Sequence, residues 1–354
     1  MKILTVVGAR PQFIKSAPVS HALRQAGHQE CLLHTGQHYD YGMSQVFFDE
    51  LSLPEPALNL GVGSGSHAQQ TGQMLMGIEA ALLAEKPDCV LVYGDTNSTL
   101  AGALAAVKLH IPVAHIEAGL RSFNRQMPEE HNRVLADHCA DLLFCPTQTA
   151  VDNLAHEGLI HGVHLVGDTM YDAVLQFGEI ARHNSSILKR HALTPRSYLL
   201  ATIHRAYNTD DPSPLGDIFA ALGQAGEPVI LPLHPRTRSA LEQHAILVPE
   251  NVTIIEPVSY LDMLALEQNA RLILTDSGGM QKEAYFFAVP CITLRPETEW
   301  IETAQSGWNL VVGTDPGRIV AAIREHTWPN TPPAHLFGDG QAAKKIIHIF
   351  CCFH

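Results

Sequence analysis

The chain has 354 residues, of which 46% are hydrophobic and 17% are charged, and its formal net charge is −13. This length and composition predict two packed domains and argue against a chain that is disordered over most of its length. Because phosphate backbones require a basic surface, the acidic balance and the absence of any Lys- or Arg-rich run argue against nucleic acid as the main partner.

The seven cysteines are scattered and include no CxxC pair, which argues against a zinc ribbon or a redox motif. The chain begins at once with the strand-like run Met1–Leu4, so we expect no signal peptide. No apolar stretch reaches the length of a bilayer span. These features predict a cytoplasmic protein that contacts no membrane.

Short apolar runs alternate with amphipathic segments, such as Gln70–Leu83 and Leu100–Lys108, along most of the chain. The first half is predicted to contain strands at Ile3–Val7, Glu30–His34, Cys89–Tyr93, Val113–Ile116, Leu142–Cys145 and His164–Val166. The second half repeats the pattern, with strands predicted at Tyr198–Ile203, Val229–Leu233, Val252–Ile255, Leu272–Thr275, Cys291–Leu294 and Asn309–Val312. Fully apolar short strands separated by helices are typical of parallel sheets that helices cover on both faces.

The predicted fold class is therefore α/β, with two Rossmann-like doubly wound domains facing a cleft that holds the ligand. We assign residues 1–180 to an N-terminal domain, 190–336 to a C-terminal domain, and 337–354 to a C-terminal helix that packs back on the N-terminal domain. Between the two domains, the polar segment Ala181–Pro195 is predicted to be an irregular linker.

The first predicted strand runs into Gly8, which is followed by Arg10, Pro11 and Lys15. Glycine permits a tight turn, Pro11 suits the first helical position, and free backbone N–H groups there attract an anion, as do the two cations. An ordinary strand–helix turn with solvated side chains is the alternative. The pattern is not GxGxxG, so a nicotinamide cofactor is disfavoured.

Three carboxylates, Asp95, Glu117 and Glu129, are predicted on loops at one end of the first sheet. Crowded carboxylates raise each other's pKa, which is the setting for an acid–base pair. Alternatively, Asp95 merely caps the following helix. Acidic side chains in the first turn of a helix also interact favourably with the helix dipole. For Glu130 we expect this role, as a charge on the protein surface. Arg133 lies four residues after Glu129, on the same helix face.

In the second half, His204 and His234 each follow a predicted strand, although 21 histidines make any single one a weak indicator. No HExxH or comparable spacing is present, so no metal is expected. The segment Thr275–Glu283 reads as a strand end, a Ser277-Gly278-Gly279 turn and a helix start. This pattern favours a diphosphate bound on helix N–H groups, with Glu283 accepting hydroxyl hydrogens from a ribose. Structural glycines alone are the alternative.

Together the motifs resemble, in order and spacing, the non-hydrolysing UDP-N-acetylglucosamine 2-epimerases over about residues 1–349. The resemblance rests on Gly8–Lys15, Gly94–Thr99, His115–Arg121, Pro128–Arg133, His204-Arg205 and Asp276–Glu283. It implies the twin-Rossmann fold shared with glycosyltransferase B enzymes, a homodimer, and cofactor-free interconversion of UDP-GlcNAc and UDP-ManNAc for surface polysaccharides.

In that family a proton leaves C2 of the sugar while UDP departs from C1, which gives a 2-acetamidoglucal intermediate. The proton then returns to the other face of C2 and UDP is added back. The resemblance implies that the catalytic residues are Asp95, Glu117, Glu129 and His204, the last of which also stabilises the diphosphate. It implies substrate-binding roles for Arg10, Lys15, Arg133, His234, Ser277, Gly278, Gly279 and Glu283.

Some positions depart from the family pattern. Tyr207 stands where a Glu is common, Trp300 stands where some members carry an Arg, and no Arg lies near Gln73. Allosteric activation by substrate is therefore not expected. The runs GARPQFIK, HTGQH and GDTNSTLAGALAA also resemble a subgroup that acts on modified sugars such as UDP-2,3-diacetamido-glucuronic acid. A glycosyltransferase of the same fold and a catalytically inactive nucleotide-sugar sensor are the remaining alternatives.

Overall fold

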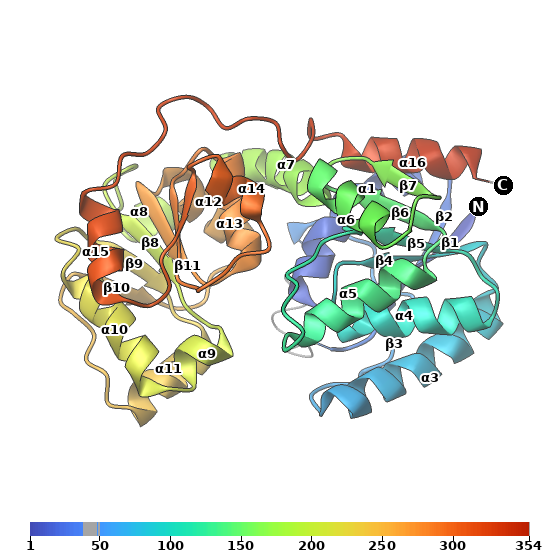
Figure 1. The fold of residues 1–354 in the computed structure, drawn as a ribbon, viewed down its shortest axis with the longest axis horizontal. Coiled ribbons are helices and arrows are strands. Elements are labelled where there is room, and N and C mark those ends of the chain that lie inside the picture. Colours follow the sequence, from blue (N-terminus) through green and yellow to red (C-terminus); the bar gives the residue numbers. More distant parts are fainter. Residues whose placement is uncertain (38–47, 49, 354) are drawn as a thin grey trace. The chain divides into compact units, whose positions relative to one another are not determined.

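The computed structural model describes residues 1–37, 48 and 50–353. It divides into two units, Met1–Gln176 with His335–His354 and Phe177–Ala334, which are described here one at a time. Each unit contains one sheet of parallel strands flanked by helices (Figure 1). The predicted class, an α/β protein built on two doubly wound sheets, is confirmed.

The first unit has a sheet in the order β3-β2-β1-β4-β5-β6-β7. Its strands are β1 (Lys2–Val7), β2 (Gln29–His34), β3 (Leu58–Asn59), β4 (Cys89–Tyr93), β5 (Val113–Ile116), β6 (Leu142–Cys145) and β7 (Val163–Leu165). Its helices are α1 (Arg10–Gln25), α3 (His67–Glu85), α4 (Asn97–Lys108), α5 (Pro128–Cys139), α6 (Gln148–His156), α16 (Ala342–Cys352) and the first part of α7 (Thr169–Asn184).

Alternate strand residues of the first sheet face opposite helix layers. Leu4, Val6, Val90 and Val92 share a buried cluster with side chains of α3, α4 and α5. On the other face, Phe350 of α16 packs edge-on against Phe144 of β6, with ring centroids 5.7 Å apart. Burial on both faces explains why the strands are mostly apolar.

The second unit repeats the same winding, with a sheet in the order β10-β9-β8-β11-β12-β13. Its strands are β8 (Leu199–Thr202), β9 (Val229–Pro232), β10 (Val252–Ile255), β11 (Leu272–Thr275), β12 (Cys291–Thr293) and β13 (Asn309–Val311). Its helices are α8 (Ile187–Arg190), α9 (Ala206–Thr209), α10 (Pro212–Gly223), α11 (Pro235–Gln243), α12 (Tyr260–Asn269), α13 (Gly278–Phe286), α14 (Ile301–Gln305) and α15 (Pro316–Arg324), together with the rest of α7.

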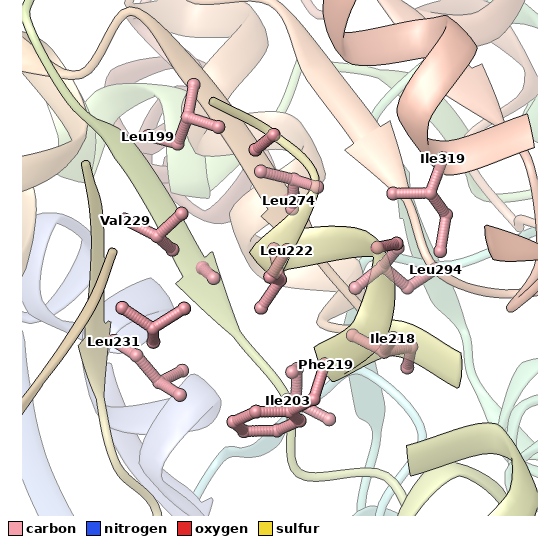
Figure 2. Packing of buried hydrophobic residues seen from close by; sticks show 14 of the residues in the cluster. Leu199, Ile203, Ile218, Phe219, Leu222, Val229, Leu231, Leu274, Leu294 and Ile319 are labelled. Atoms are coloured by element: carbon pink, nitrogen blue, oxygen red, sulfur yellow. The ribbon is translucent and has the colours of Figure 1, made fainter. Parts of the chain in front are cut away.

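The core on one face of the second sheet lies under α10 and α15 (Figure 2). Phe219 and Leu222 of α10 and Ile319 of α15 pack there with Leu199 of β8 and Leu274 of β11. All five side chains are at most 1% exposed. The sheet and its two helices therefore hold one another in place by apolar burial.

The structure confirms all twelve predicted strands, with ends shifted by one residue or none. It adds β3, which is too short for a sequence pattern to reveal. The prediction of an irregular linker at Ala181–Pro195 is wrong, because α7 continues to Asn184 and α8 follows. Phe177 and Ala181, four residues apart on α7, are both buried, and Ile187 anchors α8. The four-residue spacing is typical of a helix and could have been found in the sequence, although the surrounding residues are polar.

The C-terminal helix α16 is fixed to the first unit at both ends. Near its start, the carboxylate of Asp172 accepts hydrogen bonds from the backbone N–H groups of Ala342 and Ala343, at 3.0 and 2.8 Å. Near its end, Phe350 is fully buried. The apolar C-terminal segment is thus partly a packing element. Within the described residues, no helix has the length and apolar character needed to cross a membrane.

Leu222→Ala is expected to lower the free energy of unfolding of the second unit by about 2–5 kcal/mol, since it leaves a cavity in a fully buried cluster. All three tryptophans, Trp300, Trp308 and Trp328, belong to this unit, so urea unfolding followed by tryptophan fluorescence reports on it selectively. Leu247→Ala is the control, because Leu247 is 88% exposed and its truncation is expected to change stability by less than about 0.5 kcal/mol. Equal stability of the two variants would contradict the described core.

Candidate active site

The predicted site residues follow strands at the point where each sheet reverses its winding. In the first unit this point lies between β1 and β4, whose ends lead to Gly8 and Asp95. In the second unit it lies between β8 and β11, whose ends lead to His204 and Asp276. Ligands of open α/β sheets bind beyond the strand ends at such switch points. Both units thus present a candidate ligand-binding edge.

In the turn after β1, two backbone N–H groups are bonded within the protein. Gln12 Oε1 accepts hydrogen bonds from the N–H groups of Gly8 and Ala9, at 2.8 and 3.0 Å. Its amide nitrogen donates to the carbonyl of Tyr93 at 2.9 Å and to Thr99 Oγ1 at 3.1 Å. Gln12 therefore ties the end of β1 to the end of β4, and the two N–H groups are already occupied.

Two of the three predicted carboxylates form ion pairs. Lys15 Nζ contacts Glu117, and an Arg133 nitrogen contacts Asp95. Glu117 is buried with a backbone φ of +70°, a left-handed conformation that is costly for a residue with a side chain. The cations that the resemblance assigned to phosphate thus neutralise carboxylates in this structure.

Glu129, the third carboxylate, lies in the first turn of α5 and is half-buried. Within the described part of the chain it has no hydrogen-bond or ion-pair partner. Arg133, although on the same helix, bonds instead to Glu130 at 2.7 Å and to Asp95. One carboxylate of the three is therefore left available.

Glu130 is not the surface charge that its position in the sequence suggested, because only 5% of it is exposed. Its carboxylate accepts hydrogen bonds from Ser122 N, Ser122 Oγ and Phe123 N, each at 2.9 Å, and from Arg133. Burial acts to raise the pKa of Glu130, but these donors outweigh it and hold the pKa below its ordinary value. Glu130 thus fixes the loop before α5 and orients Arg133.

A buried ion network lies behind the loops that carry Asp95 and Glu117. The ring nitrogens of His115 lie 2.7 Å from the carbonyl of Gly94 and 2.7 Å from Asp137. Asp137 also accepts from the N–H of Gly119 at 3.1 Å and from Arg121 at 2.7 Å. Burial acts to raise the pKa of Asp137, but His115 and Arg121 lower it overall. The network fixes the residues next to both carboxylates.

In the second unit, His204 lies between Asp276 and His234. Its Nδ1 is 3.2 Å from Asp276 Oδ1, and its ring centroid is 5.6 Å from that of His234. His234 caps α11, because its Nδ1 accepts from the N–H of Arg236 at 3.1 Å. His204 is half-buried and His234 is exposed. Two imidazoles therefore stand together at the end of the second sheet.

The predicted Ser-Gly-Gly turn is present at the start of α13, where Ser277 caps the helix. A Cβ at Gly278 would collide with the carboxylate of Glu299, so glycine is required at that position. Glu299 is itself paired with Arg295 at 2.9 Å. Further along α13, Tyr260 donates a hydrogen bond to Glu283 at 3.1 Å. The turn and Glu283 thus lie on one helix, as the motif predicted.

Trp300, which departs from the family pattern, packs against a buried cation. Lys282 Nζ lies 3.8 Å from the centroid of the Trp300 ring, and only 1% of Lys282 is exposed. An aromatic face stabilises a desolvated ammonium. The aromatic residue at this position therefore has a partner within the same unit.

Among the described residues, no group of three or more His, Cys, Asp or Glu side chains is arranged to hold a metal ion.

Comparisons with known proteins identify the family. A family model described as UDP-N-acetylglucosamine 2-epimerase matches residues 21–351. The chain belongs to this family. The family expected from the ordered motifs is thus confirmed, and since its members are epimerases, the protein is an isomerase.

Individual relatives are similar along their whole length. A Methanococcus maripaludis protein named UDP-N-acetylglucosamine 2-epimerase homolog is 52% identical, and the match covers 99% of each chain. The UDP-2,3-diacetamido-2,3-dideoxy-D-glucuronate 2-epimerase of Pseudomonas aeruginosa is 49% identical over 98% of each chain. A crystal structure of the Methanocaldococcus jannaschii UDP-GlcNAc 2-epimerase, in complex with UDP-GlcNAc and UDP, matches with a TM-score of 0.90 and 43% identity over 99% of this chain and 100% of that one.

Sequence reasoning missed three residues that hold this site together, namely Gln12, Asp137 and Asp276. Each lies within or beside a motif but makes its contacts with residues far away in the chain. A buried polar residue at such a position was the only available signal, because a buried polar group needs partners. His38, the last residue of the HTGQH run, lies outside the described residues.

Glu130→Gln is expected to lower the stability of the first unit at pH 7 by about 1–3 kcal/mol, since an amide cannot accept all the hydrogen bonds of the carboxylate. A carboxylate whose pKa is lower in the folded state stabilises the protein above its unfolded value and loses that effect as the pH falls through its folded value. The difference from wild type should therefore shrink as the pH drops below about 4.

Urea unfolding followed by circular dichroism at pH 7 and at acidic pH measures this difference, while tryptophan fluorescence follows the second unit separately. Glu129→Gln is the matched control, one residue away, and is expected to change stability by less than about 0.5 kcal/mol. A Glu130→Gln deficit that stays constant as the pH falls would rule out the charge-dependent role.

Proposed function

We propose that this chain interconverts UDP-N-acetylglucosamine and UDP-N-acetylmannosamine without a cofactor, by eliminating UDP and adding it back. The observation that carries the proposal is the set of carboxylates at the strand ends of the first unit. Asp95 is paired with Arg133 and Glu117 with Lys15, while Glu129 has no partner in the described structure. A 2-epimerase needs carboxylates in two roles, one that takes a proton and one that gives it.

In the proposed elimination, a carboxylate removes the proton from C2, the C2–H electrons form the C1–C2 double bond, and the C1–O bond breaks to release UDP. In the return step, a second carboxylic acid protonates C2 on the opposite face, and a phosphate oxygen of UDP attacks C1. Because Lys15 stabilises the ionised form of Glu117, we assign Glu117 to proton removal. Glu129, which has no cationic partner among the described residues, is the candidate for proton delivery, and Asp95 is held by Arg133 beside it.

The departing diphosphate needs donors and positive charge. We assign this role in the second unit to His204, His234 and the Ser277-Gly278-Gly279 turn at the start of α13, where helix N–H groups and the helix dipole favour an anion. Glu283 is assigned to the ribose. In the first unit, Arg10 is assigned to the diphosphate, whereas Lys15 and Arg133 are assigned to holding the carboxylates.

A second candidate substrate is UDP-2,3-diacetamido-2,3-dideoxy-D-glucuronate. It is favoured by the Pseudomonas aeruginosa enzyme of that name, which is 49% identical along the whole chain. The same proton transfer at C2 applies to it.

The proposal also includes homodimeric assembly, a cytoplasmic location and supply of surface polysaccharide synthesis, for which the support is family resemblance. Light scattering after gel filtration tests the dimer.

Incubation with UDP-GlcNAc in deuterated water, with no acceptor present, is expected to place deuterium at C2 and to yield a mixture of the two epimers, both read by proton NMR. A parallel incubation with the diacetamido-glucuronate nucleotide decides between the substrates through the ratio of kcat/KM. Absence of exchange with both sugars would contradict the proposed reaction and would favour a glycosyltransferase or a sensor.

Asp95→Asn, Glu117→Gln and Glu129→Gln are each expected to lower kcat by about 10²- to 10⁴-fold, since each removes a group that transfers or positions a proton. Near-ultraviolet circular dichroism checks that the variants are folded. Glu256→Gln is the matched control, because the Glu256 side chain is 82% exposed and forms a surface ion pair with Arg238. The kcat of this variant should equal that of wild type. Full activity of all three site variants would place the chemistry on other residues.

A further inference from the structure

Asp276 is a charged residue to which the proposed reaction gives no role. It follows β11 directly, at the winding switch of the second sheet, and it is fully buried. A buried carboxylate is costly unless donors surround it, so its position calls for a physical explanation.

The two oxygens of Asp276 have different partners. Oδ2 accepts from the N–H groups of His204 and Arg205, each at 2.9 Å, and from the side-chain amide of Asn208 at 3.0 Å. Oδ1 lies 3.1 Å from the N–H of His204 and 3.2 Å from its ring Nδ1. The first set of bonds ties the turn after β8 to the end of β11. The contact to the ring is an additional one that the turn does not require.

We infer that Asp276 is a positioning residue that keeps a proton on Nδ1 of His204 and thereby presents Nε2 to the substrate. Two lone pairs 3.2 Å apart repel each other, so the ring nitrogen that faces the Asp276 carboxylate is expected to carry a proton. The inference rests on the proposed role of His204 at the diphosphate, and it deepens that role. A carboxylate that orients an imidazole and stabilises its cation is a recurrent arrangement in enzymes.

This arrangement suits a group that stabilises a leaving anion. The negative charge of Asp276 lies beside Nδ1–H of His204. When Nε2 also binds a proton, this charge stabilises the resulting imidazolium. The neighbouring ring of His234 receives a backbone N–H on its own Nδ1, so its Nε2 carries the proton when that ring is neutral. Both imidazoles are then able to present Nε2–H to the same kind of ligand, an anionic phosphate.

Asp276→Asn tests the inference because the turn itself dictates how the amide is placed. Three donors, from His204, Arg205 and Asn208, converge on Oδ2, so the amide oxygen should occupy that side. The amide NH₂ then faces Nδ1 of His204 and forces this nitrogen to accept. The substitution is therefore expected to preserve the fold, to move the ring proton to Nε2 and to disfavour the imidazolium, because the negative charge that stabilises it is lost.

The first measurement needs no substrate. Proton–nitrogen correlation spectra of the whole protein, labelled with ¹⁵N-histidine and recorded at a pH where the rings are neutral, report the tautomer of His204, whose signals are identified by their loss in His204→Asn. We expect the Nδ1–H form in wild type and the Nε2–H form in Asp276→Asn. Wild-type protein with the Nε2–H form would overturn the inference, whatever the activity.

The second measurement is a double-variant cycle of kcat. Asp276→Asn is expected to lower kcat by at least about tenfold. In the His204→Asn background the same change should alter kcat by less than about twofold, because a residue that acts through His204 has nothing left to position. Independent, multiplicative losses would overturn the inference and leave Asp276 a purely structural residue.

Asp262→Asn is the matched control, an Asp in the same unit whose carboxylate bonds to Ser185 and Arg190 rather than to a candidate site residue. Its tautomer spectrum and kcat are expected to match those of wild type. If the wild-type protein lacks epimerase activity but shows the Nδ1–H form, the proposed function fails while the positioning of His204 by Asp276 stands.

Discussion

Both sheets consist of parallel strands that helices cover on both faces, and the rest of the structure depends on this constraint. A strand buried on two faces has no place for a charged side chain along its length, because burying an unpaired charge costs several kcal/mol. Polar residues are therefore concentrated at the strand ends and in the loops that follow, and one within a strand, such as His115, needs buried partners. At the winding switch of each sheet, consecutive loops diverge to opposite faces and leave room beyond the strands. In the first unit Asp95 occupies this position and in the second unit His204 does.

The buried charges gathered at these ends are tolerated in the fold because they have partners. Asp137, fully buried, is compensated by His115 and Arg121, and Glu130 is compensated by Ser122, Phe123 and Arg133. Asp137 and Glu130 have no predicted contact with substrate, yet they set the backbone positions of the loops next to the candidate site residues. Removing one member would leave a buried charge uncompensated, which is more disruptive than the absence of the whole network. The rigidity of the candidate site therefore comes from buried polar groups behind it.

Much of this architecture could be predicted from the sequence, because a parallel sheet appears in a sequence as short apolar runs that alternate with amphipathic helices. The strand ends and the Ser277-Gly278-Gly279 turn were found in that way. The partners of the polar residues were not accessible, since they depend on contacts such as Gln12 with Tyr93, across 81 positions of the chain. The predicted linker failed for a related reason. Its polar composition concealed the buried residues Ala181 and Ile187, which lie on the packed sides of α7 and α8.

The pairing of Lys15 with Glu117 and of Arg133 with Asp95 changes how the cations of the first unit are understood. The sequence motif suggests that such cations bind phosphate, because cations near a glycine-rich turn often do. In the first unit, however, both cations are paired with carboxylates of the protein, and the N–H groups of Gly8 and Ala9 are bound to Gln12. A carboxylate held by a fixed cation has its orientation set before any ligand arrives, which is the preorganisation that a transfer of charge or of a proton at a fixed position needs.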